Sequence, residues 1–330
     1  MNRLFILPFV FLFACSDLQE EKSIDPLPSW NDVQSKQNIL AFVEGATDNS
    51  KTTFIPVDAR IATFDNDGTL WSEQPYYFQL FFVIDRIKAV ADQHPEWKTE
   101  EPYKSILDDD IMGAFAQGES ALLKLLMGAD ADIPVEEFYQ IVETWMSDAK
   151  HPRFDRAFNE LIYQPMLELM DYLRANDFKV FIVSGGEIDF MRPWVTETYG
   201  VPVDQVVGSN NKMQFSSEGN QYDVVRMPQL EFLDDKAGKP IGIMRNIGRR
   251  PVFAAGNSDG DLAMLQFTSS NTYGSFMLYV HHTDAEREWA YDRKSAIGKL
   301  DKGLDEANAK GWTVVDMKED WKVIYPFEMN

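Results

Sequence analysis

Short apolar runs alternate with helical repeats over much of this chain. We predict buried strands at 61–63, 179–183, 206–207, 252–255, 276–280 and 312–315. Between them, apolar residues recur at helical spacing over 188–199, 240–247 and 261–267. Strands that alternate with helices predict an α/β fold, in which helices cover both faces of a mainly parallel sheet.

The region from 72 to 175 interrupts this alternation. Leu80, Ile84 and Ile87 lie at helical spacing, and further helices are predicted at 118–127, 135–149 and 154–175. The sequence therefore predicts a mostly helical insert after the first strand. Farther along, a Ser-Ser-Glu-Gly-Asn stretch between two runs, 213–215 and 222–227, predicts a β-hairpin.

The first fifteen residues differ from the rest of the chain. An apolar run from Leu4 to Ala14 follows Arg3; it is too short to span a bilayer but suits the core of a secretory signal. The run ends at Cys15, the only cysteine, and Leu-Phe-Ala-Cys resembles the lipidation box of bacterial lipoproteins. We therefore predict a lipoprotein signal in 1–15 with lipidation at Cys15. A plain signal peptide with an incidental cysteine is the alternative.

Residues 16–35 are polar and acidic with two prolines, and this composition favours a tether between anchor and domain. Acyl chains on Cys15 would then hold the exported protein in the bacterial cell envelope, with membrane contact through the lipid anchor only. The sequence does not indicate an oligomeric state.

Composition and charge also limit the kinds of partner that the protein can bind. Among 330 residues, 45% are hydrophobic and 25% charged, which is ordinary for a globular protein. The 53 acidic residues exceed the 31 basic ones and set a formal net charge of -22, which argues against nucleic-acid binding. An anionic substrate would therefore need a local positive field from a metal ion, a lysine or a helix N-terminus. A single cysteine also excludes an internal disulfide.

Two carboxylates follow the first predicted strand, in Phe64-Asp65-Asn66-Asp67-Gly68-Thr69. In an extended segment, residues two apart point the same way, so Asp65 and Asp67 can face one small volume. Open α/β sheets place their sites at the carboxyl ends of strands. An ordinary polar turn is the alternative, since Asp, Asn and Gly are common turn residues.

Two further segments offer groups for an anion. The strand at 179–183 runs into Ser184-Gly185-Gly186, where small residues let backbone N–H groups approach a ligand before a helix begins. The stretch 234–240 holds Lys236 and Lys239, either of which could reach a phosphate or neutralise carboxylates.

The strand at 252–255 ends in a second acidic loop, Gly256-Asn257-Ser258-Asp259-Gly260-Asp261. Oxygen ligands without His or Cys suit Mg²⁺ rather than zinc. A plain turn or a calcium-type loop is the alternative for these residues.

Together the four loops resemble the motifs of the haloacid dehalogenase superfamily, specifically its phosphatases. That family carries Asp-x-Asp-x-Thr, then a Ser or Thr, then a Lys, then an acidic loop, and the resemblance covers about 58–282. It implies a Rossmann-like core over 36–71 and 176–330, with the helical insert 72–175 as a cap. A helical cap in that place is most similar to the phosphoserine phosphatase branch.

The resemblance also implies residue roles. Asp65 would be the nucleophile that forms an aspartyl-phosphate, and Asp67 the general acid and base. Thr69 would position the first loop and, with Ser184, Gly185 and a lysine, make up the phosphate-binding set. Spacing to the last motif favours Lys239 over Lys236 for that lysine.

The Mg²⁺ ligands implied by the resemblance are Asp65, the main-chain carbonyl of Asp67, and the acidic loop. Asn257 aligns with the family's first acid in that loop and is a weaker, neutral ligand; Asp261 matches the second acid. Asp259 is an extra carboxylate that could substitute for Asn257.

The sequence as a whole therefore favours a Mg²⁺-dependent phosphomonoesterase acting on a small phosphate ester. Phosphoserine or a broad range of esters, as for an acid phosphatase, are the family-level expectations. The alternatives are a non-catalytic surface lipoprotein that uses the fold to bind a ligand, and a phosphotransferase with an acceptor other than water.

Overall fold

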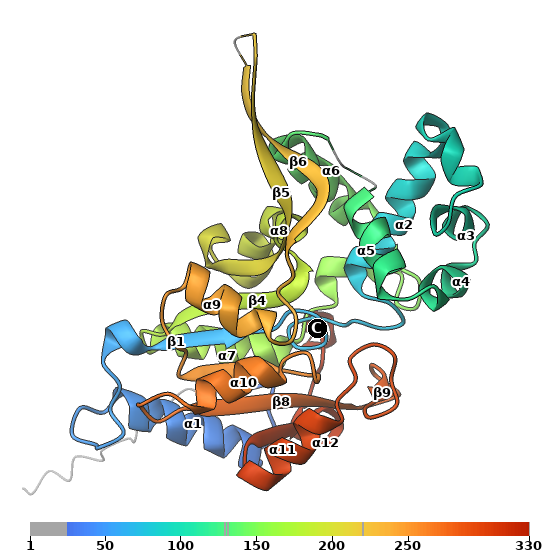
Figure 1. Cartoon of the computed structure of the whole chain (residues 1–330). Helices are drawn as coiled ribbons and strands as arrows, with labels where there is room; N and C mark the ends of the chain where they lie inside the picture. The colour runs from blue at the N-terminus through green and yellow to red at the C-terminus, as the bar shows by residue number, and fades with distance from the viewer. Residues whose placement is uncertain (1–24, 129, 131, 220, 330) are drawn as a thin grey trace, which may run out of the picture.

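The structure, a computed structural model, describes residues 25–128, 130, 132–219 and 221–329 (Figure 1). Its main sheet has the strand order β10-β8-β7-β1-β4-β5-β6, with β9 paired to β8. Neighbours from β10 to β5 are parallel, whereas β5–β6 and β8–β9 are antiparallel. The strands are β1 Ile61–Phe64, β4 Lys179–Glu187, β5 Val206–Glu218, β6 Gln221–Phe232, β7 Phe253–Gly256, β8 Phe276–Thr283, β9 Ala290–Tyr291 and β10 Thr313–Asp316.

This architecture confirms the predicted α/β fold with a mainly parallel sheet. Strand β1 lies between β4 and β7, and all four of its residues are buried. Phe64 pairs with Ile182 on one side and with Ala255 on the other. The loops that follow β1, β4 and β7 therefore leave the sheet at one edge.

Alternating side chains from the strands enter two cores, as the period of two in a strand requires. Val183, Val207 and Ala254 face helices α9 (Gly238–Asn246), α10 (Leu262–Ser269) and α11 (Lys302–Lys310). The adjacent Ile182 and Val206 face the opposite core. That core is covered by α1 (Gln34–Thr47), α7 (Gln164–Ala175), α8 (Ile188–Tyr199) and α12 (Met317–Asp320).

The cap contains five α-helices among the described residues, which stand above the sheet in Figure 1. These are α2 Phe78–Val90, α3 Tyr103–Leu107, α4 Ile111–Ala116, α5 Glu119–Gly128 and α6 Val135–Asp148. The predicted hairpin forms as β5 and β6 and extends along α6 in Figure 1, with β6 contacting α5 and α6. The cap is therefore built from two separate parts of the chain.

The predicted helix 154–175 is correct only in its second half. The chain forms a small antiparallel pair, β2 (Lys150–His151) with β3 (Arg156–Ala157), before α7 begins next to Pro165. Helix α7 packs against β4 of the sheet, so it belongs with the core although the cap was expected to extend to 175. Helical spacing shows which face of a helix is apolar but not which element covers that face.

Single 3-10 turns connect several elements of the fold. They lie at Val57–Ala59, Ala91–Gln93, Pro95–Lys98, Phe158–Glu160, Val203–Gln205 and Pro326–Met329.

The segment before α1 packs on the core from Leu27 onward. Leu27 and Trp30 are fully buried, and Trp30 Nε1 donates to the Pro165 carbonyl at 2.9 Å. The described part of the tether expected over 16–35 therefore packs on the core. It does so because two large apolar side chains interrupt the polar composition of this segment. The predicted signal in 1–15, Cys15 and the first part of the tether lie outside the described residues. Within the described part of the chain, no helix has the length and apolarity needed to cross a bilayer.

Candidate active site

Lys239 connects strand β4 with the loops that follow β1 and β7. Its ammonium lies 2.6 Å from Asp65 Oδ1, 2.9 Å from Asp261 Oδ1 and 2.6 Å from the Val183 carbonyl. The side chain is 2% exposed, so these contacts are shielded from water. Lys239 therefore holds together the ends of β1, β4 and the loop after β7.

The other candidate lysine lies elsewhere. The Lys236 side chain is 68% exposed and its ammonium lies 3.0 Å from Asp235 Oδ2. The structure therefore brings Lys239, and not Lys236, to Asp65. Sequence spacing favoured Lys239, and the position of the residue in the first turn of α9 agrees with it.

Asp65 and Asp67 lie in different surroundings although they are two residues apart. The Asp65 amide donates to the Ala255 carbonyl at 2.9 Å, which extends the β1–β7 pairing by one residue. Burial and the neighbouring Asp261 raise the pKa of Asp65 well above its usual value, and Lys239 opposes this shift.

The Asp67 carboxylate lines the cavity above the sheet. Trp71 Nε1 donates to Asp67 Oδ1 at 2.9 Å. Burial raises the pKa of Asp67 to about 6, although the Trp71 hydrogen bond lowers it. Such a carboxyl exists in both protonation states near neutral pH, as a general acid and base requires.

Gly68 lets the first loop turn tightly against the acidic loop. Its φ is +69°, and a Cβ at this position would lie 1.9 Å from Asn257 Nδ2. The Gly68 carbonyl lies 2.8 Å from His282 Nε2. Thr69 is fully buried, and its hydroxyl donates to Asn257 Oδ1 at 3.5 Å. Thr69 therefore supports the position of Asn257.

The Ser184-Gly185-Gly186 segment lies in the last part of β4, which extends to Glu187 beyond the predicted strand end at 183. Ser184 is fully buried, and its hydroxyl accepts a hydrogen bond from the Gly186 amide at 3.0 Å. A Cβ on Gly186 would lie 3.7 Å from Asp67 Oδ2. This small residue therefore brings the backbone near the end of β4 close to the Asp67 carboxylate.

The two carboxylates of the acidic loop, those of Asp259 and Asp261, contact different parts of the structure. Asp261 Oδ2 accepts from the amides of Asn257 and Ser258, both at 3.0 Å, and its other oxygen faces Lys239. Asp259 Oδ1 accepts from the amides of Asp301 and Gly303, at 2.9 and 2.8 Å, where α11 begins. The structure therefore brings Asn257 and Asp261 to the site and directs Asp259 to a helix start.

Sequence reasoning missed Glu73. Its side chain is buried, and Oε1 accepts from Asn257 Nδ2 at 2.6 Å and from the Tyr291 hydroxyl at 2.7 Å. Burial raises the pKa of Glu73 well above its usual value. Glu73 lies in a loop with no motif and no periodic pattern, and its partners come from distant segments. No signal in the sequence alone could have found it.

Arg226 is a second residue near the site that the sequence patterns did not indicate. It is 1% exposed on β6 and pairs with Glu187 at the end of β4. Its Nη1 donates to the Asp130 carbonyl at 2.8 Å, and its guanidinium carbon lies 3.5 Å from the Phe138 ring centre. One side chain of the hairpin therefore joins the cap to the sheet beside the site.

The chemistry of these donors fits Mg²⁺. In the described part of the chain, no group of three or more His, Cys, Asp or Glu side chains is arranged around a metal position. The carboxylates of Asp65 and Asp261 converge on the Lys239 ammonium, at 2.6 and 2.9 Å, and Asn257 lies in the same loop as Asp261. Asp261 Oδ1 is buried and, apart from its ion pair with Lys239, has no hydrogen-bond partner among the described residues. A single ammonium, that of Lys239, faces both carboxylates, so an added cation would offset their remaining negative charge.

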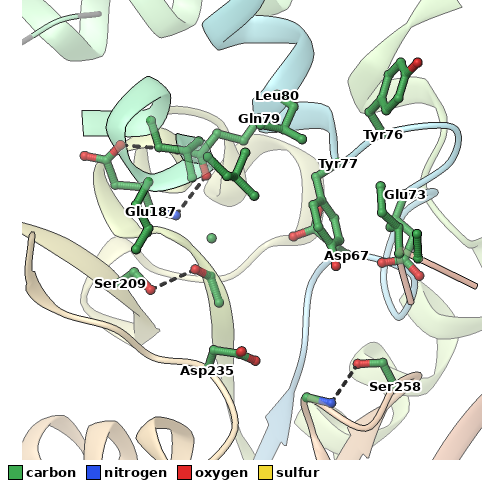
Figure 2. A pocket seen from close by; sticks show the side chains of 18 of the residues that line it. Asp67, Glu73, Tyr76, Tyr77, Gln79, Leu80, Glu187, Ser209, Asp235 and Ser258 are labelled. Atoms are coloured by element: carbon green, nitrogen blue, oxygen red, sulfur yellow. Dashed lines mark hydrogen bonds between the residues drawn. The ribbon is translucent and has the colours of Figure 1, made fainter. Parts of the chain in front are cut away.

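A cavity of about 630 Å³ lies between the sheet edge and the cap. Asp65, Asp67 and Lys239 are among the residues that line it. Figure 2 shows the labelled side chains around this space, with Asp67, Glu73 and Tyr77 along one side and Glu187, Ser209 and Asp235 along the other. The carboxylates of Asp65 and Asp67 therefore line a space large enough for a small molecule under the cap.

Comparison with known proteins agrees with this geometry. The family model of haloacid dehalogenase-like hydrolases matches residues 62–266, which span all four loops of the site. No curated protein matches the chain significantly.

Two of the similar solved structures share the fold. A protein of unknown function from Bordetella pertussis Tohama I is 17% identical, with 78% of this chain and 98% of that chain covered and a TM-score of 0.50. A conserved, functionally unknown protein from Anaerococcus prevotii DSM 20548 is 14% identical, with coverages of 88% and 94% and a TM-score of 0.51. A phosphoserine phosphohydrolase-like protein from Francisella tularensis subsp. tularensis SCHU S4 is more distant, at 15% identity, coverages of 67% and 87%, and a TM-score of 0.36.

Proposed function

Because the chain belongs to the haloacid dehalogenase-like hydrolases, we propose that it is a Mg²⁺-dependent phosphomonoesterase that uses Asp65 as its nucleophile. The observation that carries the proposal is the pair Asp65 and Asp67 in unlike surroundings. Asp65 contacts Lys239, whereas Asp67 contacts Trp71 and has a pKa raised by burial to about 6. One carboxylate is suited to attack and the other to proton transfer.

In the first step an Asp65 oxygen forms a bond to phosphorus, and the bond between phosphorus and the ester oxygen breaks. Protonated Asp67 gives its proton to the departing oxygen, so the leaving group departs as an alcohol. The products of this step are an aspartyl-phosphate on Asp65 and an ionised Asp67.

In the second step the ionised Asp67 takes a proton from water as the water oxygen attacks phosphorus. The bond between phosphorus and the Asp65 oxygen breaks, which releases inorganic phosphate. Both aspartates then have their starting protonation states.

Negative charge on the phosphoryl oxygens would be met by groups at the ends of β4 and in α9. The Lys239 ammonium, the Ser184 hydroxyl and the Gly185 amide are the proposed phosphate-binding groups. Mg²⁺ would be held by Asp65, the Asp67 carbonyl, Asn257 and Asp261, and it would supply further positive charge to the phosphoryl oxygens.

An assay of the full chain in detergent tests the proposal. Phosphate release from a panel of esters would be followed with Mg²⁺ and with a chelator, beside Asp65→Asn. We expect Mg²⁺-dependent release that Asp65→Asn abolishes. Full activity in Asp65→Asn would exclude this nucleophile, and an absence of turnover on every ester would favour a non-catalytic binding protein. Transfer of phosphate to an added alcohol without release would identify a phosphotransferase.

The proposal extends to location. Lipidation of Cys15 would anchor the enzyme in the cell envelope, as the signal-like residues 1–15 suggest. Metabolic labelling with a lipid precursor should mark the wild-type protein and not Cys15→Ser. An unlabelled, freely soluble wild-type protein would contradict the anchor without affecting the proposed chemistry.

A further inference from the structure

The cavity above Asp65 has a polar floor and an apolar wall. The floor is formed by the loops that follow the strands, with Asp65, Asp67 and Lys239. The wall is formed by cap elements that lie far from one another in sequence. It contains Leu80 of α2, Met112 and Phe115 of α4, Leu122, Leu123 and Leu126 of α5, and Leu230 of β6.

Most side chains of this wall keep part of their surface exposed. Phe115, Leu123 and Leu126 are only half-buried, and Met112 is 65% exposed. Leu122 and Leu126 are four residues apart on α5, so they lie on one face of that helix. A contiguous apolar lining in a concave site marks a surface that buries a ligand.

The charged groups of the cavity outside the catalytic floor have protein partners. Glu187 pairs with Arg226 and accepts from Gln79 Nε2 at 3.2 Å. Asp235 lies 3.0 Å from Lys236, and Glu73 accepts from Asn257 and Tyr291.

These pairings leave an anionic leaving group without a suitable partner. The cavity lining contains two lysines, Lys236 and Lys239, and no arginine among the described residues. Outside the floor, a substrate carboxylate would therefore face the carboxylates of Glu187 and Asp235, and Lys236 is the one cation there among the described residues of the lining. Like charges that share a cavity oppose binding.

We propose that the natural ester carries an uncharged, apolar leaving group, such as an alkyl chain or an aromatic ring, which lies against the α4–α5 wall. This inference rests on the proposed function and names the substrate class of the same site. The phosphoryl group would bind at the Asp65 floor, and its ester oxygen would face Asp67. The volume of about 630 Å³ suits a leaving group well beyond the size of serine.

A homologous series of n-alkyl monophosphates tests the inference, with the full chain, detergent and Mg²⁺. Burial of each methylene favours binding enough to raise kcat/KM about fourfold, until the wall is covered. We expect this rise from methyl to hexyl phosphate, phenyl phosphate above methyl phosphate, and phosphoserine and phosphocholine below hexyl phosphate.

The possible outcomes separate the two proposals. A flat alkyl series, or a preference for anionic phosphoserine or cationic phosphocholine, would overturn the apolar leaving group and leave the phosphatase intact. An absence of hydrolysis for every ester would overturn the phosphatase and this inference with it.

Variants of α5 test the position of the leaving group. Leu123→Arg places a charge in the wall, so the ratio of kcat/KM for hexyl to methyl phosphate should fall at least about tenfold, mainly through KM. Leu126→Gln is a milder change that should lower the same ratio. Ser120→Ala, on the same helix and outside the cavity lining, should leave the ratio unchanged. An unchanged ratio in both folded leucine variants would overturn the proposal.

Discussion

Glu73 Oε1 lies 2.6 Å from Asn257 Nδ2, so an acid from the loop before the cap orients the amide of Asn257 in the acidic loop. The same oxygen accepts from the Tyr291 hydroxyl at 2.7 Å, and it is therefore an acceptor on both sides. With Nδ2 directed to Glu73, the other amide atom, Oδ1, is directed away from it. The structure also leaves room for this carboxylate, because a Cβ on Gly298 would lie 1.8 Å from Glu73 Oε1.

Glu73 should therefore control Mg²⁺ affinity through its contact with Asn257. Loss of a residue that orients a metal ligand commonly costs about 10–100-fold in affinity. Glu73→Ala should weaken Mg²⁺ binding by that amount, and Glu73→Gln should stay much closer to wild type because its amide oxygen still accepts. Calorimetric titration with Mg²⁺ measures this without turnover. Wild-type affinity in Glu73→Ala would show that Asn257 needs no such support.

Asp259 and Asp261 should respond differently to the same substitution. Asp261→Asn should abolish Mg²⁺ binding, because it removes the negative charge of a proposed Mg²⁺ ligand. Asp259→Asn should bind Mg²⁺ like wild type and keep most of the unfolding free energy, because the Asn amide oxygen still accepts from the start of α11. Asp259→Ala should lower the free energy of unfolding by about 1 kcal/mol, as the loss of a helix cap does. Titration and chemical denaturation of these variants separate the two effects. Loss of Mg²⁺ binding in Asp259→Asn would assign this carboxylate to the metal.

Arg226 should be a major contributor to stability. Arg226→Met leaves Glu187 and Asp189 buried without their guanidinium partner, and breaking such a pair costs roughly 3–5 kcal/mol of unfolding free energy. Burial already raises the pKa of Glu187 to about 6, with Arg226 opposing the shift. Without Arg226, more free energy is needed to keep the ionised Glu187 carboxylate buried. The loss of unfolding free energy in Arg226→Met should therefore be larger at pH 8 than at pH 5.

Denaturation of Arg226→Met at both pH values measures the deficit. The double variant Arg226→Met with Glu187→Gln is the matched control, because it removes the uncompensated charge and should recover part of the loss. A deficit independent of pH in the single variant would assign the effect to lost packing on Phe138 instead.

Asp234 should make the protein less stable as the pH rises. It is fully buried, both of its carboxylate oxygens lack hydrogen bonds, and burial raises its pKa from 3.8 to about 7. The folded state therefore holds this proton more tightly than the unfolded state does. The contribution of this proton to the free energy of unfolding is complete below about pH 4. It is lost as the pH rises through about 7, at about 1.4 kcal/mol per pH unit.

Asp234→Asn should remove that slope. Unfolding free energies of wild type and variant at several pH values between 4.5 and 7.5 provide the comparison, since other groups contribute equally to both. Parallel curves for the two proteins would show that Asp234 has an ordinary pKa in the folded state.

Sequence patterns predicted the strands well because each buried strand is a short apolar run with a turn at its end. They failed at 154–163, where an apolar pattern compatible with a helix forms β3 and a 3-10 turn instead. The packed segment at Leu27 and Trp30 was missed for a similar reason. Two apolar residues in a polar stretch do not show whether a complementary surface exists elsewhere.

The sequence by itself determined the α/β fold, the family and the order of the four loops, because these depend on local periodicity and on short motifs. Tertiary structure decided which of Lys236 and Lys239 reaches Asp65, and which of Asp259 and Asp261 faces the site. It also supplied Glu73, Arg226 and the apolar wall of the cap. Each of these depends on contacts between residues far apart in the chain, and such contacts leave no pattern in any single segment.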